Sequence, residues 1–437
     1  MSIREFFPSR SDYSLVTRAS ARLDLTAGLS VAIVALPLAL AFGVSSGVGA
    51  QAGLVSAIIA GILAAIFGGS HLQVSGPTGA MTVVLIPIYA QFGAHAVFAV
   101  GFVAGIILVV ASFMGAAHSM RYIPLSVIEG FTLGIALLIG LQQIPLALGI
   151  KADSSSVVLS ALHAIQASTV TLHRQSLAIS LGTVAFIVVA RKIHATMPAG
   201  IIAVALATIA TSALTLDVKT VGSIPRTLTW IGLPSLSDLP WASLVLPALS
   251  VAGLAAIEGL LCASVADSMV DVPAHNPHRE LLGQGIANLV VPLFGGVPAT
   301  AAIARTAVNV KAGATSRIAA ITHSVILLVC VLGASRLVSH IPLASLAGVL
   351  IATAARMIDV RRLRDFVSHT THHAVTLSLT ALATLFLDLV EAVALGLIVA
   401  TALSLLQSPR EQRKHESEIN EAEHVMHDAF HEDHLEP

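Results

Sequence analysis

Apolar segments of membrane-spanning length follow one another along most of this chain, and they constrain its fold more than any other feature. A helix needs about 20 apolar residues to cross the hydrocarbon core of a bilayer. Charged residues make up only 11% of the chain, whereas soluble domains contain about 25%. We therefore predict an all-α polytopic membrane protein with fourteen transmembrane segments, the third and tenth of which are too short to cross alone. The predicted segments are 24–45, 51–67, 77–92, 96–116, 123–148, 176–190, 197–215, 245–269, 281–294, 304–314, 318–335, 343–357, 373–388 and 391–407.

The distribution of Lys and Arg predicts how these spans are oriented. If the N-terminus is cytoplasmic and successive spans alternate in direction, most basic residues between spans fall on the cytoplasmic side. Cytoplasmic loops of membrane proteins are enriched in Lys and Arg. We therefore expect a multi-pass cell-membrane protein with both termini in the cytoplasm. Its parts would be a cytosolic segment at 1–22, a transmembrane transport domain at 23–407 and a polar, His- and Glu-rich cytosolic tail at 408–437.

Two short interruptions occupy corresponding places in the two halves of the chain. The first runs from Phe67-Gly68-Gly69 to Thr78, and the second from Phe294-Gly295-Gly296 to Thr300. A second repeated motif, Ile-Pro-Leu at 123–125 and 341–343, has nearly the same separation. These pairs predict two seven-span repeats, at about 23–215 and 245–407. Because seven is odd, the second repeat is inverted, and inverted repeats bring their broken helices together near the membrane midplane.

The residues at the two interruptions favour an anion as the ligand. A helix that begins near Pro77 presents free backbone N–H groups and a partial positive charge, to which Thr78 can add a hydroxyl donor. The helix that begins near Ala304 carries Arg305 in its first turn. Two helix N-termini and a guanidinium form a site for an anion. The alternative for Arg305 is a side chain that extends to the membrane interface.

A single carboxylate, Glu258, lies in the middle of the predicted span 245–269. A carboxylate there is costly unless it is paired, bound to a cation or protonated. Pairing with Arg305 would keep an empty site neutral, and proton uptake by Glu258 would then compensate the charge of an incoming anion. A purely structural Glu258–Arg305 pair is the alternative.

Other functional classes lack a signal in the sequence. The net charge of −1 provides no basic face for nucleic acid. There is no nucleotide-phosphate loop of the GxxxxGK[ST] type and no nucleophile–base set. We therefore expect no cofactor, no metal and no enzymatic activity.

Several of these motifs resemble the sulfate permease family (SulP, solute carrier family 26), over about residues 10–410. The matching stretches are Asp24–Leu29, Ala35–Phe42, Gln73–Gly79 and Ala304–Asn309. The resemblance implies the inverted-repeat fold of uracil and xanthine permeases. It also implies a core domain that moves as an elevator against a gate domain, often in a homodimer. Most members continue into a cytosolic STAS domain, which would begin near the tail at 408–437.

The resemblance also assigns site residues. It places the coupling acid on Glu258 and the anion site on Phe42, Ser75, Thr78, Gly79, Ala301, Ala302, Ile303, Ala304 and Arg305. In sodium-coupled bicarbonate members the acid is an Asp with a Thr one turn later, whereas this chain has Glu258 and Cys262. The Gly-Ala-Thr of the tenth segment reads Ala301-Ala302-Ile303. Two hydroxyl ligands for sodium are missing, which favours proton coupling.

The combined prediction is a secondary active anion transporter that carries sulfate, bicarbonate or a dicarboxylate together with a proton by elevator alternating access. A sodium-coupled bicarbonate transporter, an anion exchanger or channel, and a nucleobase–proton symporter are the alternatives that the sequence leaves open.

Overall fold

The architecture of the chain is taken from a computed structural model. It describes residues 8, 17–117, 124–150, 156–168, 173–194, 197–223, 227–234, 239–270, 274–358, 371–387 and 389–406. These residues form helices joined by short connections, together with one two-stranded sheet. The predicted polar tail at 408–437 and most of the predicted N-terminal segment lie outside the described residues.

The helices of the first half follow the predicted spans closely. They are α1 (Arg18–Ser45), α2 (Ala50–Phe67), α3 (Gly79–Phe113), α4 (Leu125–Ala147), α5 (Val157–Ser168), α6 (Arg174–Ile193) and α7 (Ala199–Ala213). α1 begins earlier than predicted, because Thr17 and Ser20 form a capping box at its N-terminus. The predicted spans 77–92 and 96–116 meet within α3 at Gly93, whose φ of 76° breaks the helix. The sequence analysis missed α5, since its 12 residues are too few to cross a bilayer.

The second half contains a helix at each predicted span. These helices are α8 (Trp241–Met269), α9 (Pro277–Val290), α10 (Ile303–Lys311), α11 (Ile318–Ser339), α12 (Leu343–Met357), α14 (Thr371–Phe386) and α15 (Leu389–Leu406). A 3-10 helix, η4 (Val291–Phe294), follows α9. Among the described helices, seven are long and apolar enough to cross a membrane, namely α1, α2, α3, α4, α6, α8 and α11. With the shorter apolar helices they indicate a multi-pass membrane protein.

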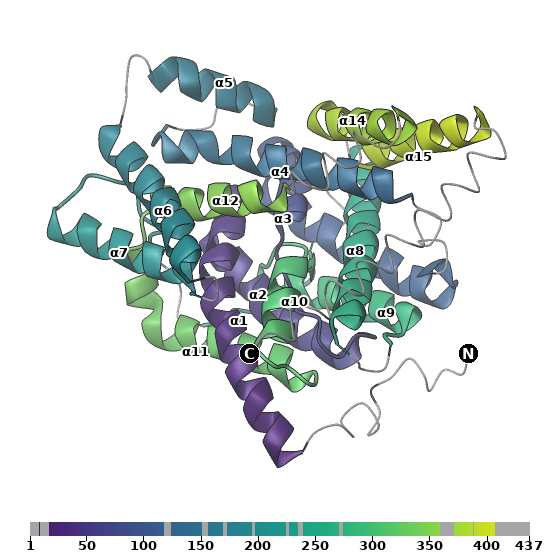
Figure 1. The fold of residues 1–437 in the computed structure, drawn as a ribbon, viewed down its shortest axis with the longest axis horizontal. Coiled ribbons are helices and arrows are strands. Elements are labelled where there is room, and N and C mark those ends of the chain that lie inside the picture. Colours follow the sequence, from purple (N-terminus) through teal and green to yellow (C-terminus); the bar gives the residue numbers. More distant parts are fainter. Residues whose placement is uncertain are drawn as a thin grey trace.

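The helices pack as two groups, which we call the site group (α1–α3 and α8–α11) and the flanking group (α4–α7, α12, α14 and α15). Within the site group, α1 packs against α11, α2 against α9, and α3 against α8 and α9. Within the flanking group, α4 packs against α12 and α14, and α12 also packs against α6. Figure 1 shows α4, α5, α14 and α15 toward one edge of the molecule and α1, α9, α10 and α11 toward the opposite edge.

Small residues allow helices of the site group to approach closely. A Cβ atom at Gly105 of α3 would overlap the backbone of α9 at Leu289, and one at Gly28 of α1 would overlap the carbonyl of Ala319 on α11. Lipid tails are as apolar as leucine, so membrane helices associate through such close packing and through polar contacts. Each of these contacts joins a helix from the first half of the chain to one from the second.

Candidate functional site

The two interruptions meet as a short antiparallel sheet. Strand β1 (Ser75–Gly76) pairs with strand β2 (Thr300–Ala301), with Ser75 opposite Ala301 and Gly76 opposite Thr300. The pairing continues where Ala302 N–H donates to the Val74 carbonyl at 3.0 Å. β1 leads into the N-terminus of α3 and β2 into that of α10. The expectation that the two breaks face one another is confirmed, and the two helix N-termini start from the same sheet.

Thr78 occupies the N-cap of α3 and joins it to α8. Its Oγ1 accepts a hydrogen bond from Met81 N–H and donates one to Glu258 Oε2 at 3.1 Å. The hydroxyl was expected to serve as a free donor to a ligand. In this arrangement its one proton is directed at the carboxylate.

Arg305 lies in the first turn of α10 and is 1% exposed. Its Nη2 donates to the Pro77 carbonyl at 2.8 Å, so the guanidinium spans the two interruptions. Gly76 makes room for it, because a Cβ there would overlap Nη1. Among the described residues, Nη1 has no hydrogen-bond partner. The alternative of a side chain that extends to the membrane interface is therefore wrong.

The structure does not contain the expected direct pair between Glu258 and Arg305. The ion pair that the described residues show at less than 4.0 Å on α8 joins Asp267 to His275 and does not involve Glu258. Glu258 and Arg305 lie near enough to interact electrostatically, but Glu258 bonds to Thr78 and Arg305 to Pro77. The pairing was predicted from charge alone, and the positions of α8 and α10 give each group another partner.

Phe42 forms an apolar wall at the start of α3. It is 7% exposed, and its ring lies beside Gly79, where a Cβ would come 3.2 Å from Phe42 Cε1. Ile139 of α4 closes the same position, because that Cβ would also overlap its side chain. Sequence analysis missed Ile139, which is one apolar residue among many in its span.

The N-terminus of α10 differs from that of α3 in being uncapped. Its N-cap, Ala302, has no side chain that can accept a hydrogen bond, and no side-chain cap is formed. Ala301 is buried in β2, whereas Ala304 is exposed and Ile303 is 41% exposed. The first turn of α10 therefore presents backbone N–H groups without a side-chain partner, at the end of the helix that carries positive charge.

Three polar residues of α9, which the sequence analysis did not single out, are also buried at the interruptions. Glu280, Gln284 and Asn288 are each at most 1% exposed. Arg279 and Arg317 donate to carbonyls at the C-terminus of α2. The signal that could have found the α9 residues is their spacing of four, which places them on one face of a helix.

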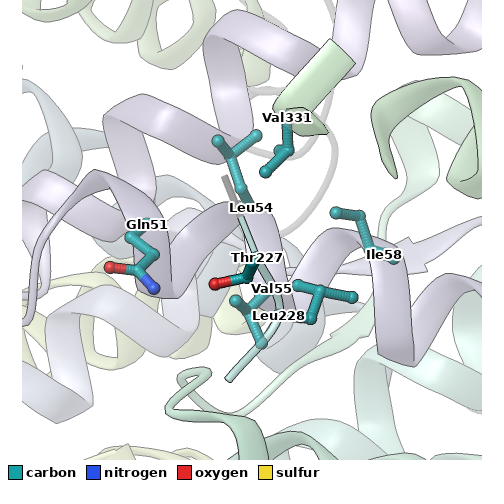
Figure 2. Close-up of a pocket in the computed structure, with 7 residues that line it drawn as sticks. All are labelled: Gln51, Leu54, Val55, Ile58, Thr227, Leu228 and Val331. Atoms are coloured by element: carbon teal, nitrogen blue, oxygen red, sulfur yellow. The ribbon is translucent and has the colours of Figure 1, made fainter. Parts of the chain in front are cut away.

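A small pocket lies next to the second interruption, where a Cβ at Gly296 would come 3.1 Å from the side chain of Val55. Figure 2 shows its lining, formed by Gln51, Leu54, Val55, Ile58, Thr227, Leu228 and Val331. It has no charged residue and contains none of the predicted site residues.

The fold and the site together define a class of protein. Helices interrupted by extended segments, whose ends meet around a buried guanidinium in a multi-pass membrane protein, are typical of secondary transporters. The chain belongs to the sulfate permease family, whose sequence profile matches residues 22–380. The resemblance drawn from the sequence motifs is therefore confirmed.

Known relatives are anion transporters by name. The chain is 35% identical over 403 residues to the putative sulfate transporter YvdB of Bacillus subtilis, covering 91% of this chain and 76% of that protein. It is 32% identical over 418 residues to the bicarbonate transporter BicA of Picosynechococcus, covering 91% and 74%.

Two solved structures have a fold similar to that of this chain. The transmembrane domain of a cyanobacterial bicarbonate transporter BicA matches with a TM-score of 0.80 at 31% identity, covering 86% of this chain and 98% of that one. The murine anion transporter Slc26a9 in its inward-facing state matches with a TM-score of 0.81 at 19% identity, covering 93% and 72%. The latter likeness concerns the fold alone.

Proposed function

We propose that this protein is a secondary active transporter that couples uptake of a small oxyanion or carboxylate to a proton. The observation that carries the proposal is the β1–β2 pairing, which brings the uncapped N-terminus of α10, the buried Arg305 and the Thr78–Glu258 pair to one place. The names of the relatives favour sulfate and bicarbonate as the anions to test first.

The charge of the site favours an anion. Arg305 is buried, and no carboxylate lies within ion-pair distance of it in the described residues. A buried guanidinium without a direct counterion, next to the positive end of a helix, attracts negative charge. A neutral nucleobase would leave the positive charge of Arg305 and of the helix N-terminus uncompensated, so the nucleobase symporter is the weaker alternative.

Glu258 and Thr78 suggest how a proton is coupled to the anion. When Glu258 is ionised, the Thr78 hydroxyl donates to it. When Glu258 is protonated, its own O–H can donate to Thr78 Oγ1, which keeps its bond from Met81 N–H. The proton of Thr78 is then free to turn toward an anion. Protonation thus removes one negative charge and creates one hydrogen-bond donor at the same moment.

The packing supports an elevator movement of one helix group against the other. The interruptions and Glu258 belong to the site group, while Ile139 of the flanking group closes one side of the site. Moving the site group along the flanking group would carry the anion from one side of the membrane to the other. We propose the seven-plus-seven inverted repeat, cytoplasmic termini and a homodimer as parts of the same mechanism.

Uptake by purified protein in proteoliposomes tests the proposal. Labelled sulfate and bicarbonate are offered with an inward proton gradient, an inward sodium gradient or neither, with uracil as a neutral competitor. We expect the proton gradient alone to drive accumulation, and Glu258→Gln to abolish that drive while exchange of anion for anion persists. Accumulation driven by sodium alone, or an unchanged proton-driven rate in Glu258→Gln, would overturn the coupling. Non-saturating currents would indicate a channel instead.

A further inference from the structure

One face of α9 carries three buried polar side chains, Glu280, Gln284 and Asn288, which we call the α9 ladder. Residues four apart lie one above another on a helix, and all three are at most 1% exposed. Burying such groups is costly unless their hydrogen bonds are made. Their partners are the two interruptions.

Glu280 binds the first interruption where it leaves α2. Its Oε2 accepts from the backbone N–H groups of Gly69 at 3.0 Å and Ser70 at 3.2 Å. Its Oε1 accepts from Gln73 Nε2 at 2.7 Å and from Gln284 Nε2 at 2.9 Å. Four donors thus converge on one carboxylate.

Gln284 and Asn288, the next two residues of the α9 ladder, contact strand β1 and the residue that precedes strand β2. Gln284 Nε2 also donates to Ser75 Oγ at 2.8 Å, in β1. Asn288 binds the backbone of Ala299 twice, accepting from its N–H and donating to its carbonyl, each at 2.8 Å. Ala299 immediately precedes β2. A single helix face therefore holds the first interruption at one end and the second at the other.

The surroundings leave the ladder little freedom to move. Gly283 packs on Gly68, where a Cβ would overlap the end of α2. Gly259, next to Glu258 on α8, faces the side chain of Gln284, from which its Cβ would lie 3.3 Å. The ladder is thus packed between the end of α2 and the part of α8 that carries the proposed proton-coupling acid.

We propose that the α9 ladder positions the two interruptions relative to each other, and that Glu280, through its four hydrogen bonds, thereby sets the affinity of the site for its anion. The inference rests on the proposed function. Glu280, Gln284 and Asn288 are positioning residues that act through Ser75, Thr78 and the start of α10. A shift of β1 against β2 would separate the hydroxyl of Thr78 from the N-terminus of α10, although neither group is itself altered.

Exchanging donors and acceptors along the ladder tests this role. Glu280→Gln keeps the size of the side chain but removes the negative charge and turns an N–H toward the amides of Gln73 and Gln284. Donors then face donors unless both amides turn, and turning Gln284 withdraws its donor from Ser75 Oγ. The double variant Glu280→Gln/Gln284→Glu pairs donors with acceptors again. The carboxylate at position 284 then accepts from the amide at position 280 and from the Ser75 hydroxyl. Gln73 can rotate its amide so that its Oε1, which has no partner among the described residues, accepts from the amide at position 280.

Uptake kinetics of the full chain in proteoliposomes, with sulfate and bicarbonate, provide the main measurement. We expect Glu280→Gln to raise KM about tenfold with a smaller change in the maximal rate, and the double variant to recover most of the affinity. Ser112→Ala is the matched control. It removes an equally buried 2.7 Å hydrogen bond, from α3 to the His278 carbonyl of α9, that does not touch the interruptions. Its KM should stay at the wild-type value.

Hydrogen exchange of the purified protein separates this inference from the proposed function. Glu280→Gln should speed amide exchange in residues 69–76, and the double variant should slow it again, whether or not anion uptake is observed. If the wild-type protein transports no anion but the exchange changes as expected, the proposed function fails and the positioning role stands. Unchanged KM and unchanged exchange in folded Glu280→Gln would overturn the inference, as would a folded double variant that recovers neither. If Glu280→Gln does not fold, Asn288→Asp provides the same test at residues 297–304.

Discussion

The hydroxyl of Thr78 and the carboxylate of Glu258 are joined by a 3.1 Å hydrogen bond, which links the first interruption to α8. The same hydroxyl oxygen caps α3 by accepting from Met81 N–H at 3.3 Å. One side chain thus serves both the stability of a helix terminus and the group that we propose to carry the proton.

Thr78→Val tests both roles together, because it removes the hydroxyl that makes the two hydrogen bonds. The valine has nearly the same shape but cannot cap α3 or donate to Glu258. We expect a loss of about 1 kcal/mol of stability from the missing cap and a loss of proton-driven uptake of at least about tenfold. Thr78→Ser keeps both hydrogen bonds and should retain most of the uptake. A valine variant that keeps the wild-type proton-driven rate would contradict the role of the hydroxyl.

Arg305 should provide charge rather than a unique hydrogen bond. Arg305→Gln is neutral, and its side chain ends two bonds short of the position of Nη2, so the Pro77 carbonyl also loses its donor. Arg305→Lys therefore separates the charge from the geometry of the guanidinium. We expect the Gln variant to fold and to lose stabilisation by sulfate or bicarbonate in a thermal shift measurement, because the charge that attracts the anion is gone. Arg305→Lys keeps the charge and should retain part of the anion effect. Equal stabilisation of the wild type and the Gln variant by the anion would contradict this prediction and show that the helix N-termini bind the anion without the charge of Arg305.

Gly76 should be intolerant of even one methyl group. A Cβ there would overlap Arg305 Nη1 and come 3.2 Å from the Cα of Ala57. We expect Gly76→Ala to displace the guanidinium, lower the melting temperature and weaken anion affinity about tenfold or more. Gly253→Ala on α8 is the matched control, since no atom lies within 4 Å of a Cβ at that position. Its stability should be unchanged or slightly raised, as expected for alanine in a helix.

Arg317 should contribute to folding without affecting anion specificity. It is 1% exposed, and its Nη1 donates to the carbonyls of Ala65 at 2.9 Å and Gly68 at 2.7 Å at the end of α2. Arg317→Met leaves these buried carbonyls without that donor, so we expect a loss of about 3 kcal/mol. A melting curve in detergent measures the loss. Arg336→Met, at an exposed position of the same helix, is the control and should melt like the wild type. Equal melting of the two variants would contradict the capping role.

Much of the fold could be predicted from the linear pattern of apolar residues. Hydropathy located a helix at each predicted span, and the Gly- and Pro-rich interruptions located both strands. The exceptions have physical causes. α5 is too short to be recognised by length, and the extension of α1 to Arg18 depends on a local capping box.

The candidate site was predicted in composition but not in its contacts. The sequence places Thr78, Glu258 and Arg305 at interruptions or within a span, where polar groups are rare and therefore noticeable. It paired Glu258 with Arg305 because opposite charges attract, whereas the structure pairs Glu258 with Thr78 and Arg305 with Pro77. Which partner a side chain finds depends on the rotation and depth of each helix, and hydropathy contains neither.

By itself, the sequence determined that this chain is a multi-pass helical membrane protein of the sulfate permease family, with two corresponding breaks and a basic residue, Arg305, at the second of them. Those properties follow from residue type and order, since the bilayer requires apolar spans and penalises unpaired charge. The tertiary structure alone decided that the breaks pair as strands, that Thr78 donates to Glu258, and that one face of α9 holds both breaks. Apart from the contact between Asn288 and Ala299, these contacts join residues far apart in the chain, and only the packing of helices brings them within hydrogen-bond distance.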